Sequence, residues 1–450
     1  MGWNRNKGLI ILYFPPVSWQ LNVDKGYHRF PYSLWSLVPG LMAEGFDVKV
    51  FDGRIDDKNA FLDAVKASPS PLLVGISSLT GAQLLDAMKT AKQVREINKE
   101  IPIVWGGWHV TLNPAESIKE EFVDTIIMRR GETEIVTLAN ELIRGVDRRK
   151  TIICDPILAE TFPKIPFDLV DINKYGPYFG YLTSTGCKWH CSFCAIQQVY
   201  KGKMFFKNMD QVIKELKYIV DNYRGLRQIN IDDDLFFIKK DRVEEFCDRW
   251  NNYGGIPMSV LAHVNVLLKY DDNLWKKIIK TGFHHILIGA ESGNQTILNR
   301  LKKHQTPDTM LQFVEKTRQF RITPELSTMT GFIDSCELQD FKDTILFLKK
   351  AGEINPRTAY KLFWSRPYPG TELFEQVKAA EYKMPSTMRE WANYTLRYCP
   401  PWVDRELEDQ VNYFVYTFQP RVGWNYDWDS FIKSFEDARS RGPISGPTGL

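Results

Sequence analysis

The chain has 450 residues, of which 44% are hydrophobic and 25% charged, a composition typical of folded globular domains that excludes extended disorder. The 58 Lys and Arg residues against 55 Asp and Glu leave a net charge of +3, which gives no electrostatic case for nucleic acid as a partner. No apolar stretch approaches the ~20 residues that cross a bilayer, so no membrane span is expected.

The first 145 residues alternate short apolar runs with amphipathic helical patterns, and we predict that residues 1–145 form one domain. Strands rich in Val, Ile and Leu with helices between them indicate an α/β domain of Rossmann-like (flavodoxin-like) type, with a parallel sheet covered on both faces. Ligands of such sheets bind outside the carboxyl ends of the strands. The predicted strands are Leu9–Phe14, Asp47–Phe51, Leu72–Ile76, Ile101–Trp105 and Thr125–Met128, with helices over Ala82–Asn98 and Glu132–Arg144.

Residues 146–176 carry spaced prolines without periodicity, and we predict a linker there. Alternation resumes in residues 177–375, where six strand–helix units favour a partial (β/α)6 barrel over a closed eightfold one. The strands are predicted at Tyr181–Thr185, Gln228–Asp232, Ser259–Val264, His285–Ala290, Glu325–Phe332 and Ala359–Trp364. The helices are predicted at Met209–Tyr223, Arg242–Tyr253, Leu274–Thr281, Pro307–Phe320 and Leu338–Ala351. Residues 376–450 are rich in aromatic side chains and are predicted as a small packed region, with a substrate lid as the sharper hypothesis.

Three of the seven cysteines, Cys187, Cys191 and Cys194, fall within eight residues after the first predicted barrel strand. Thiolates bind soft metals, and three on one loop can converge on one centre. Structural zinc sites usually take four ligands in two separated pairs, whereas a [4Fe-4S] cluster on three cysteines leaves one iron open to a small molecule. The spacing favours the cluster, with zinc as the alternative. The other cysteines are scattered and give no disulfide framework, so we expect a reducing, cytoplasmic compartment.

These motifs, in this order, resemble those of the radical S-adenosylmethionine (SAM) superfamily. The cysteines form a C-x3-C-x2-C loop, and three further motifs follow at the ends of later predicted strands. The matching residues are Phe193 before the last cysteine, Asp233-Asp234 after the second strand, Gly289-Ala290-Glu291-Ser292-Gly293 after the fourth, and Arg366-Pro367-Tyr368-Pro369-Gly370-Thr371-Glu372-Leu373 after the sixth.

The first domain resembles the cobalamin-binding domain that precedes the barrel in one branch of this superfamily. Its matching residues include Ser77, Ser78, Gly106, Gly107 and Glu132, and the resemblance implies that these contact cobalamin. The D-x-H-x-x-G string that supplies a cobalt-ligating histidine in many cobalamin proteins is absent. His28 is its nearest counterpart, with the wrong spacing, and His109 is expected to be a hydrogen-bonding residue. We therefore expect cobalamin without a histidine on its lower face.

The resemblance implies a methyltransferase that uses a [4Fe-4S] cluster, SAM and cobalamin to methylate an unactivated carbon of a small molecule, lipid or peptide. A 5′-deoxyadenosyl radical would abstract hydrogen and methylcobalamin would donate the methyl group. Phe193 would then pack near adenine, Asp233 and Asp234 would bind substrate or SAM, and Glu291 and Ser292 would hold the ribose or methionine part. An external electron donor of flavodoxin or ferredoxin type is implied as a partner.

Three alternatives remain open from the sequence. The same cofactors serve rearrangement, ring contraction or cyclisation in some relatives. A methylthiotransferase would have three further cysteines near its N-terminus, whereas here only Cys154 precedes the triplet. A non-catalytic scaffold with zinc on the triplet is the alternative from another class.

Overall fold

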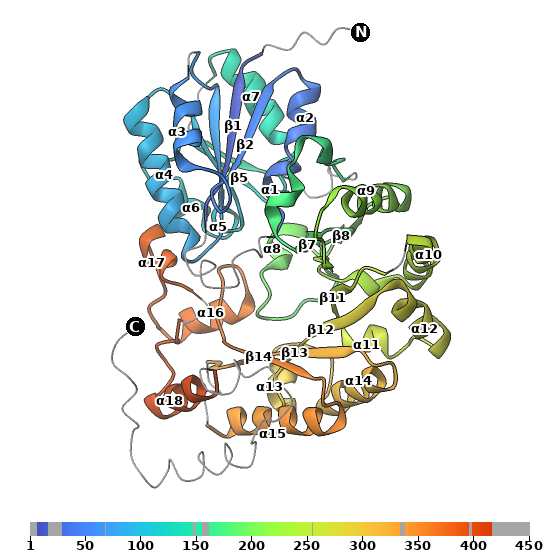
Figure 1. The fold of residues 1–450 in the computed structure, drawn as a ribbon. Coiled ribbons are helices and arrows are strands. Elements are labelled where there is room, and N and C mark those ends of the chain that lie inside the picture. The colour runs from blue at the N-terminus through green and yellow to red at the C-terminus, as the bar shows by residue number, and fades with distance from the viewer. Residues whose placement is uncertain are drawn as a thin grey trace.

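The computed structural model contains two parallel six-stranded sheets, one in each half of the chain, with helices packed on both (Figure 1). It describes residues 7–16, 29–67, 69–146, 150–154, 162–253, 255–333, 338–395 and 398–415. The two sheets and their order along the chain confirm the predicted α/β architecture. Within these ranges, no helix combines the length and the apolar character that crossing a bilayer requires.

The first sheet has the strand order β2-β1-β3-β4-β5-β6, and every neighbouring pair is parallel. Separate hydrophobic clusters cover its two faces, one built around Phe61 and Trp105 and the other around Leu34 and Leu138. The strands are β1 (Leu9–Phe14), β2 (Asp47–Asp52), β3 (Leu73–Ser78), β4 (Ile103–Gly107), β5 (Thr125–Met128) and β6 (Lys150–Ile153). The helices are α1 (Tyr32–Trp35), α2 (Val38–Ala43), α3 (Lys58–Lys66), α4 (Gln83–Ile97), α5 (Trp108–Leu112), α6 (Pro114–Ser117) and α7 (Glu134–Ile143).

Strand β6 lies inside the stretch that the sequence predicts as a linker. It pairs in parallel with β5, so the first sheet continues beyond residue 145. The strand has only four residues and lies at the edge of the sheet, where Ile153 is 62% exposed. A short edge strand lacks the long apolar run that marks the central strands, which explains why the sequence pattern does not show it.

The second sheet has the order β14-β13-β12-β11-β10-β7, again with all pairs parallel, as expected for an open six-unit barrel. Its strands are β7 (Tyr178–Tyr181), β10 (Gln228–Ile231), β11 (Met258–Ala262), β12 (Phe283–Glu291), β13 (Thr323–Thr330) and β14 (Ala359–Trp364). Its helices are α8 (Ile196–Tyr200), α9 (Met209–Asn222), α10 (Lys240–Trp250), α11 (Val264–Leu267), α12 (Asp272–Thr281), α13 (Gln295–Arg300), α14 (Pro307–Gln319) and α15 (Leu338–Ile354). The largest hydrophobic cluster of the described chain surrounds this sheet.

The first barrel strand begins and ends earlier than predicted. The sequence places it at Tyr181–Thr185, whereas β7 spans Tyr178–Tyr181 and pairs with β10. Residues 184–185 instead form β8 (Ser184–Thr185), which pairs antiparallel with β9 (Phe205–Phe206). The prediction is wrong there because the apolar run continues into a hairpin that leaves the sheet.

The C-terminal helices connect the second sheet to the first domain. They are α16 (Glu372–Ala379), α17 (Met388–Ala392) and α18 (Arg405–Tyr413), and α17 packs against α4 of the first domain (Figure 1). In α17, Trp391 is 1% exposed, and its indole N–H donates a hydrogen bond of 3.1 Å to Glu116. The aromatic residues described in this region therefore serve packing between domains, and the part of the lid hypothesis that concerns residues 416–450 lies outside the described residues.

Candidate active site

The three cysteines lie on the loop between β8 and α8. All three side chains are partly exposed free thiols. Burial raises the pKa of Cys187 and Cys191, and it raises that of Cys194 to about 12, with smaller contributions from the neighbouring thiolates. In the described ranges, no three Cys, His, Asp or Glu side chains have the arrangement that binds a single metal ion. The structure thus groups the three predicted thiols on one loop, close enough to affect each other's ionisation.

A buried carboxylate at the end of β10 holds the approach to this loop. Asp233 is 1% exposed and accepts three hydrogen bonds from the residues before the loop. The donors are the backbone N–H of Thr183 (2.6 Å), the hydroxyl of Thr183 (2.5 Å) and the hydroxyl of Ser184 (2.6 Å). Burial raises the pKa of Asp233, and these hydrogen bonds act in the opposite direction. Asp233 is therefore a positioning residue in this structure, with its known bonds directed to the chain itself.

The next carboxylate holds the first turn of the loop. Asp234 accepts a hydrogen bond of 2.7 Å from the backbone N–H of Gly186, and burial raises its pKa to about 6. Gly186 has φ of +89°, and a Cβ at this position would lie 2.1 Å from the carbonyl oxygen of Lys203. Only glycine fits such a turn, so the sequence Gly186-Cys187 fixes where the first thiol leaves the hairpin.

A buried ion pair lies beside the thiols. Glu291, the last residue of β12, is 6% exposed, has φ of +63° and pairs with Lys303 at 2.8 Å. Burial alone would lower the pKa of Lys303, but Glu291 and Cys191 outweigh it and raise the pKa. The Lys303 ammonium also lies 5.8 Å from the ring centre of Phe193. The sequence analysis missed Lys303, because a lone lysine twelve residues after Glu291 belongs to no motif.

Other residues of the predicted SAM site pack against the protein. Ser292 is 2% exposed, accepts a hydrogen bond of 2.9 Å from the Asn294 N–H and lies 3.3 Å from the hydroxyl of Thr344. Phe193 is partly buried against a hydrophobic cluster that includes Phe332. A Cβ on Gly293 would lie 2.6 Å from the Asp343 carbonyl oxygen, so close packing on α15 accounts for this motif glycine.

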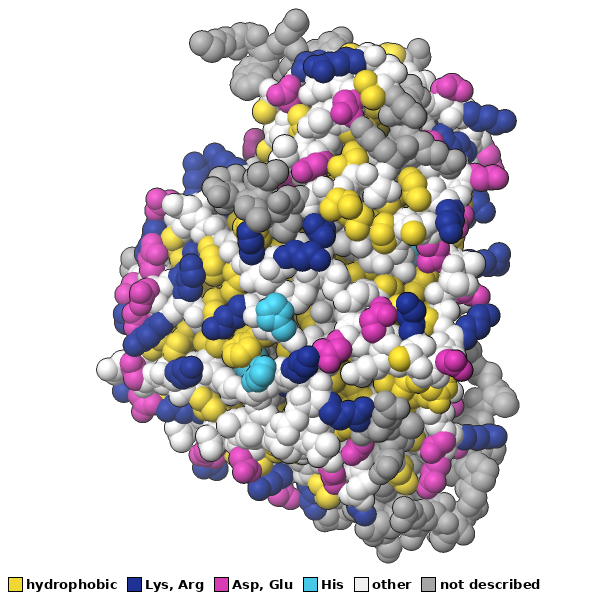
Figure 2. Space-filling view, turned by 180° about the vertical axis from the view of Figure 1, so that it is seen from behind, with side chains coloured by type: hydrophobic (Ala, Val, Ile, Leu, Met, Phe, Trp, Pro, Cys, Tyr) yellow, Lys and Arg dark blue, Asp and Glu magenta, His cyan; other side chains and the backbone are white. Residues whose placement is uncertain are grey.

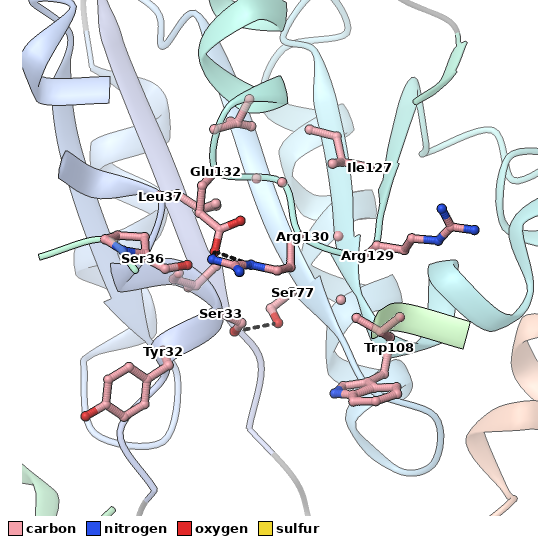
Figure 3. A pocket seen from close by; sticks show the side chains of 18 of the residues that line it. Tyr32, Ser33, Ser36, Leu37, Ser77, Trp108, Ile127, Arg129, Arg130 and Glu132 are labelled. Atoms are coloured by element: carbon pink, nitrogen blue, oxygen red, sulfur yellow. Dashed lines mark hydrogen bonds and ion pairs between the residues drawn. The ribbon is translucent and has the colours of Figure 1, made fainter. Parts of the chain in front are cut away.

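A cavity of about 280 Å³ lies at the carboxyl edge of the first sheet (Figure 3). Of the residues predicted to contact cobalamin, it is lined by Ser77, Gly106, Gly107 and Glu132. Ser78 does not line it, since its hydroxyl donates a hydrogen bond of 2.7 Å to the carbonyl of Gly106. The rest of the wall is mainly apolar and includes Leu12, Leu34, Leu37, Val104, Ile127 and Ile135.

Polar groups project into this cavity from two sides (Figure 3). The hydroxyl oxygens of Ser33 and Ser77 lie 3.2 Å apart across one wall. On the other, Arg130 pairs with Oε1 of Glu132 at 3.2 Å. The second carboxylate oxygen of Glu132, Oε2, is buried and has no hydrogen-bond partner among the described residues. The cavity therefore offers an unused acceptor in an apolar setting.

Both ends of the cysteine loop reach the same cavity. Thr185, two residues before Cys187, lines it, and so do Val199 and Tyr200 of α8, which follows the third cysteine. Lys207, which lines it too, is 2% exposed and pairs with Glu215 at 2.8 Å. The site of the first domain and the cysteine loop are thus parts of one continuous region.

The two histidines considered from the sequence have different outcomes. His109 is fully buried, its Nδ1 lies 3.1 Å from the Thr80 hydroxyl, and burial lowers its pKa to about 3. It does not line the cavity, which agrees with the hydrogen-bonding role predicted for it. His28 and most of its loop lie outside the described residues.

The residues present fit both cofactors that the resemblance implies. Three thiols on one loop supply the ligands of a [4Fe-4S] cluster, and the cation of Lys303 beside them compensates part of their negative charge. At the cavity, the unpartnered oxygen of Glu132 can accept a hydrogen bond from an amide at the edge of a corrin. A Cβ on Gly106 would have its nearest neighbour at 3.8 Å, so this glycine leaves room beside the sheet for a ligand.

Two protein-family profiles match the chain in the order of the two sheets. "B12 binding domain" matches residues 26–139 and "Radical SAM superfamily" matches residues 181–348. The chain is therefore a radical SAM enzyme with an N-terminal B12-binding domain, the family predicted from its motifs.

Individual relatives extend this assignment. The chain is 28% identical over 410 residues to "Uncharacterized methyltransferase PH0819" of Pyrococcus horikoshii, which covers 86% of both chains. It is 24% identical to "Uncharacterized methyltransferase sll1242" of Synechocystis, covering 91% of this chain and 75% of the relative. Among solved structures, the methyltransferase TsrM from Kitasatospora setae, with cobalamin and a [4Fe-4S] cluster bound, aligns with a TM-score of 0.65 at 17% identity, over 83% of this chain and 75% of TsrM. The cobalamin-dependent radical SAM enzyme OxsB, with aqua-cobalamin and SAM bound, aligns with a TM-score of 0.73 at 15% identity, over 96% of this chain and 71% of OxsB. At these identities the two structures show that the fold is shared.

Proposed function

We propose that this protein is a methyltransferase that adds a methyl group to an unactivated carbon of a small molecule, lipid or peptide. The observation that carries the proposal is the cavity of the first domain, whose wall includes residues from both ends of the cysteine loop. A methyl donor in the cavity and a radical source on the loop belong to one region, which a transfer between them requires. The names of the two relatives PH0819 and sll1242 support the same reaction class.

When bound, the cluster supplies the electron that cleaves SAM, and the cobalamin carries the methyl group. The chain's own residues supply position and exclusion of water. Asp233 and Asp234 hold the start of the cysteine loop, and Lys303 with Glu291 balances charge beside the thiols. The apolar wall of the cavity excludes water from the region between the two sites.

A cyclisation or rearrangement is the second candidate. The anaerobic magnesium-protoporphyrin IX monomethyl ester cyclase of Rubrivivax gelatinosus is 23% identical over 335 residues, 68% of this chain and 58% of the relative. The same two domains therefore occur in proteins named for ring closure and in proteins named for methylation. We place the protein in the cytoplasm, with a small-molecule, lipid or peptide substrate and an external one-electron donor, because its described cysteines are all free thiols.

The test is anaerobic reconstitution of the full chain with iron, sulfide and cobalamin, followed by incubation with SAM that carries an isotope-labelled methyl group. We expect bound iron and cobalamin, formation of 5′-deoxyadenosine, and labelled methyl in a product when extract of the source organism is added. A product without the label would support cyclisation or rearrangement instead. A chain that takes up no iron and cleaves no SAM would contradict both and favour the zinc-bound scaffold.

A further inference from the structure

We propose that the surface around Trp189 docks an acidic protein that carries single electrons, an inference that rests on the proposed function. We define the Trp189 face as the side chains of Arg129, Lys188, Trp189, His190, Lys201 and His304. These residues come from three separate stretches of the chain, and each is exposed or partly exposed. The occupant is argued below from charge, from position and from backbone strain.

The contacts of the structure group these residues. The Lys188 ammonium lies 5.2 Å from the centre of the Trp189 ring, and the ring of His304 lies 5.9 Å from the same ring. A Cβ on Gly202, the residue after Lys201, would lie 3.5 Å from the ring of His190. One face of the molecule shows two histidine side chains close together with lysine and arginine side chains around them (Figure 2).

The positive charge of the Trp189 face is not neutralised locally. Arg129, Lys188 and Lys201 form no ion pair within the described part of the chain. The pKa of Lys201 is lowered by burial and by the like charge of Arg129, which shows that two cations face each other without an acid between them. The side chain of Arg129 extends away from the cavity, toward this side (Figure 3). In a chain with a net charge of only +3, such a local excess selects an acidic partner.

The Trp189 face also lies where an electron would have to enter. Trp189 stands between Cys187 and Cys191 in the loop, and its ring stacks on His263 at 4.5 Å and 18°. A partner that covers Trp189 is therefore within two residues of two thiols. The step moves one electron and no atoms: the carrier is oxidised by one electron, and the cluster on the thiolates is reduced by one.

Backbone strain gives an independent sign of function here. Lys201 and His304 both have left-handed backbones, with φ of +50° and +52°. Glu291 and Lys302 nearby share this property, so four of the seven non-glycine residues with positive φ in the described chain surround the cysteine loop. Such residues cost roughly 1–3 kcal/mol each and cluster at functional sites. The strain fixes the directions of two side chains on the Trp189 face.

The experiment uses the reconstituted full chain and reduced flavodoxin, an acidic carrier, as the probe. The variant K188E/K201E reverses two charges of the Trp189 face, and K276E/K280E reverses two exposed lysines of α12 as a matched control. We expect the dissociation constant for flavodoxin and the flavodoxin-supported rate of SAM cleavage each to worsen at least tenfold in the first variant and to stay unchanged in the control. In the wild type, the flavodoxin-supported rate should fall steeply as salt is added.

Cleavage driven by dithionite, a small reductant that needs no docking, should be equal in all three chains. Flavodoxin binding and flavodoxin-supported rates that are the same in K188E/K201E and in the control would overturn the proposal. So would a short single-stranded RNA that binds the Trp189 face in place of flavodoxin, since it would assign the face to nucleic acid. If dithionite supports no cleavage in any chain, the proposed function fails, while the binding measurement still decides the docking proposal.

Discussion

The carboxyl edges of the two sheets form their sites in opposite ways. At the first sheet, Gly106, Gly107 and Ser77 leave a cavity, and a single ion pair lies in its wall. At the second, buried carboxylates and the Lys303–Glu291 pair fill the space and hold a loop in place. The difference follows from what each site must do: a large ligand needs room, whereas three thiols on a loop need to be kept together.

The strongest test of this comparison removes the thiols alone. Replacing Cys187, Cys191 and Cys194 together by Ala should abolish 5′-deoxyadenosine formation, a loss of at least ~1000-fold, because the ligands of the cluster are gone. The cavity lies mostly in the other domain, so binding of cobalamin should persist. Reconstituted chains would be compared by product chromatography and by the visible absorbance of cobalamin. A triple variant that still produces 5′-deoxyadenosine would contradict the cluster assignment.

Removing the support of the loop tests whether buried charge holds it. Asp233→Asn keeps the size of the side chain but replaces a carboxylate that accepts three hydrogen bonds. We expect the free energy of unfolding in urea to fall by about 3 kcal/mol, as when a buried, hydrogen-bonded charge loses its partners. Iron uptake should fall as well. Asp210→Asn, at an exposed position in α9, is the control and should change the unfolding free energy by less than ~0.5 kcal/mol.

At the first sheet, two neighbouring glycines separate the need for space from the need for backbone freedom. Gly107 has φ of +99°, and a Cβ there would lie 2.6 Å from the Ser78 carbonyl, so Gly107→Ala should lower the unfolding free energy by about 2 kcal/mol. Gly106→Ala meets no atom within 3.8 Å and should leave stability nearly unchanged. Its methyl group would enter the cavity, and we expect cobalamin binding to weaken about tenfold in an equilibrium titration. If Gly106→Ala binds cobalamin like the wild type, the cavity is not the corrin site.

The same contrast explains what the sequence could predict. Strands β1, β5 and β14 match their predicted residues throughout, because continuous runs of apolar residues mark buried parallel strands. The cysteine loop was found because residue type and spacing alone define a thiolate site. These signals are local, and a single chain displays them directly.

Features that depend on tertiary contacts were not predictable in this way. Lys303 and Glu291 are paired only because a loop folds back beside the end of β12, and neither spacing nor composition shows it. Ser78 and Ser292 were predicted to contact ligands, but a motif gives the residue type and not the direction of the side chain. In the structure their hydroxyls bond to neighbouring parts of the chain. Such directions depend on packing between elements that are far apart in sequence.

The smallest expected effect concerns the packing behind the cavity, at His109. Burial lowers its pKa to about 3 from an ordinary value of 6.5, so the folded chain keeps it neutral where the unfolded chain would protonate it. The unfolded state therefore binds more protons between pH 6.5 and 3, and stability falls as the pH drops through this window. Between pH 7 and pH 5 the loss due to this residue is about 2 kcal/mol.

His109→Gln keeps a side chain that can bond to Thr80 but removes the titration. Urea unfolding of both chains at pH 7 and pH 5 would measure it, and the wild type should lose about 2 kcal/mol more than the variant over this interval. Carboxylates titrate equally in both chains and cancel in the difference. Equal losses would mean that His109 is already accessible to protons in the folded state. The helix that carries His109 would then be looser than the buried packing indicates, and the layer behind Gly107 would be as compliant as the cavity in front of it.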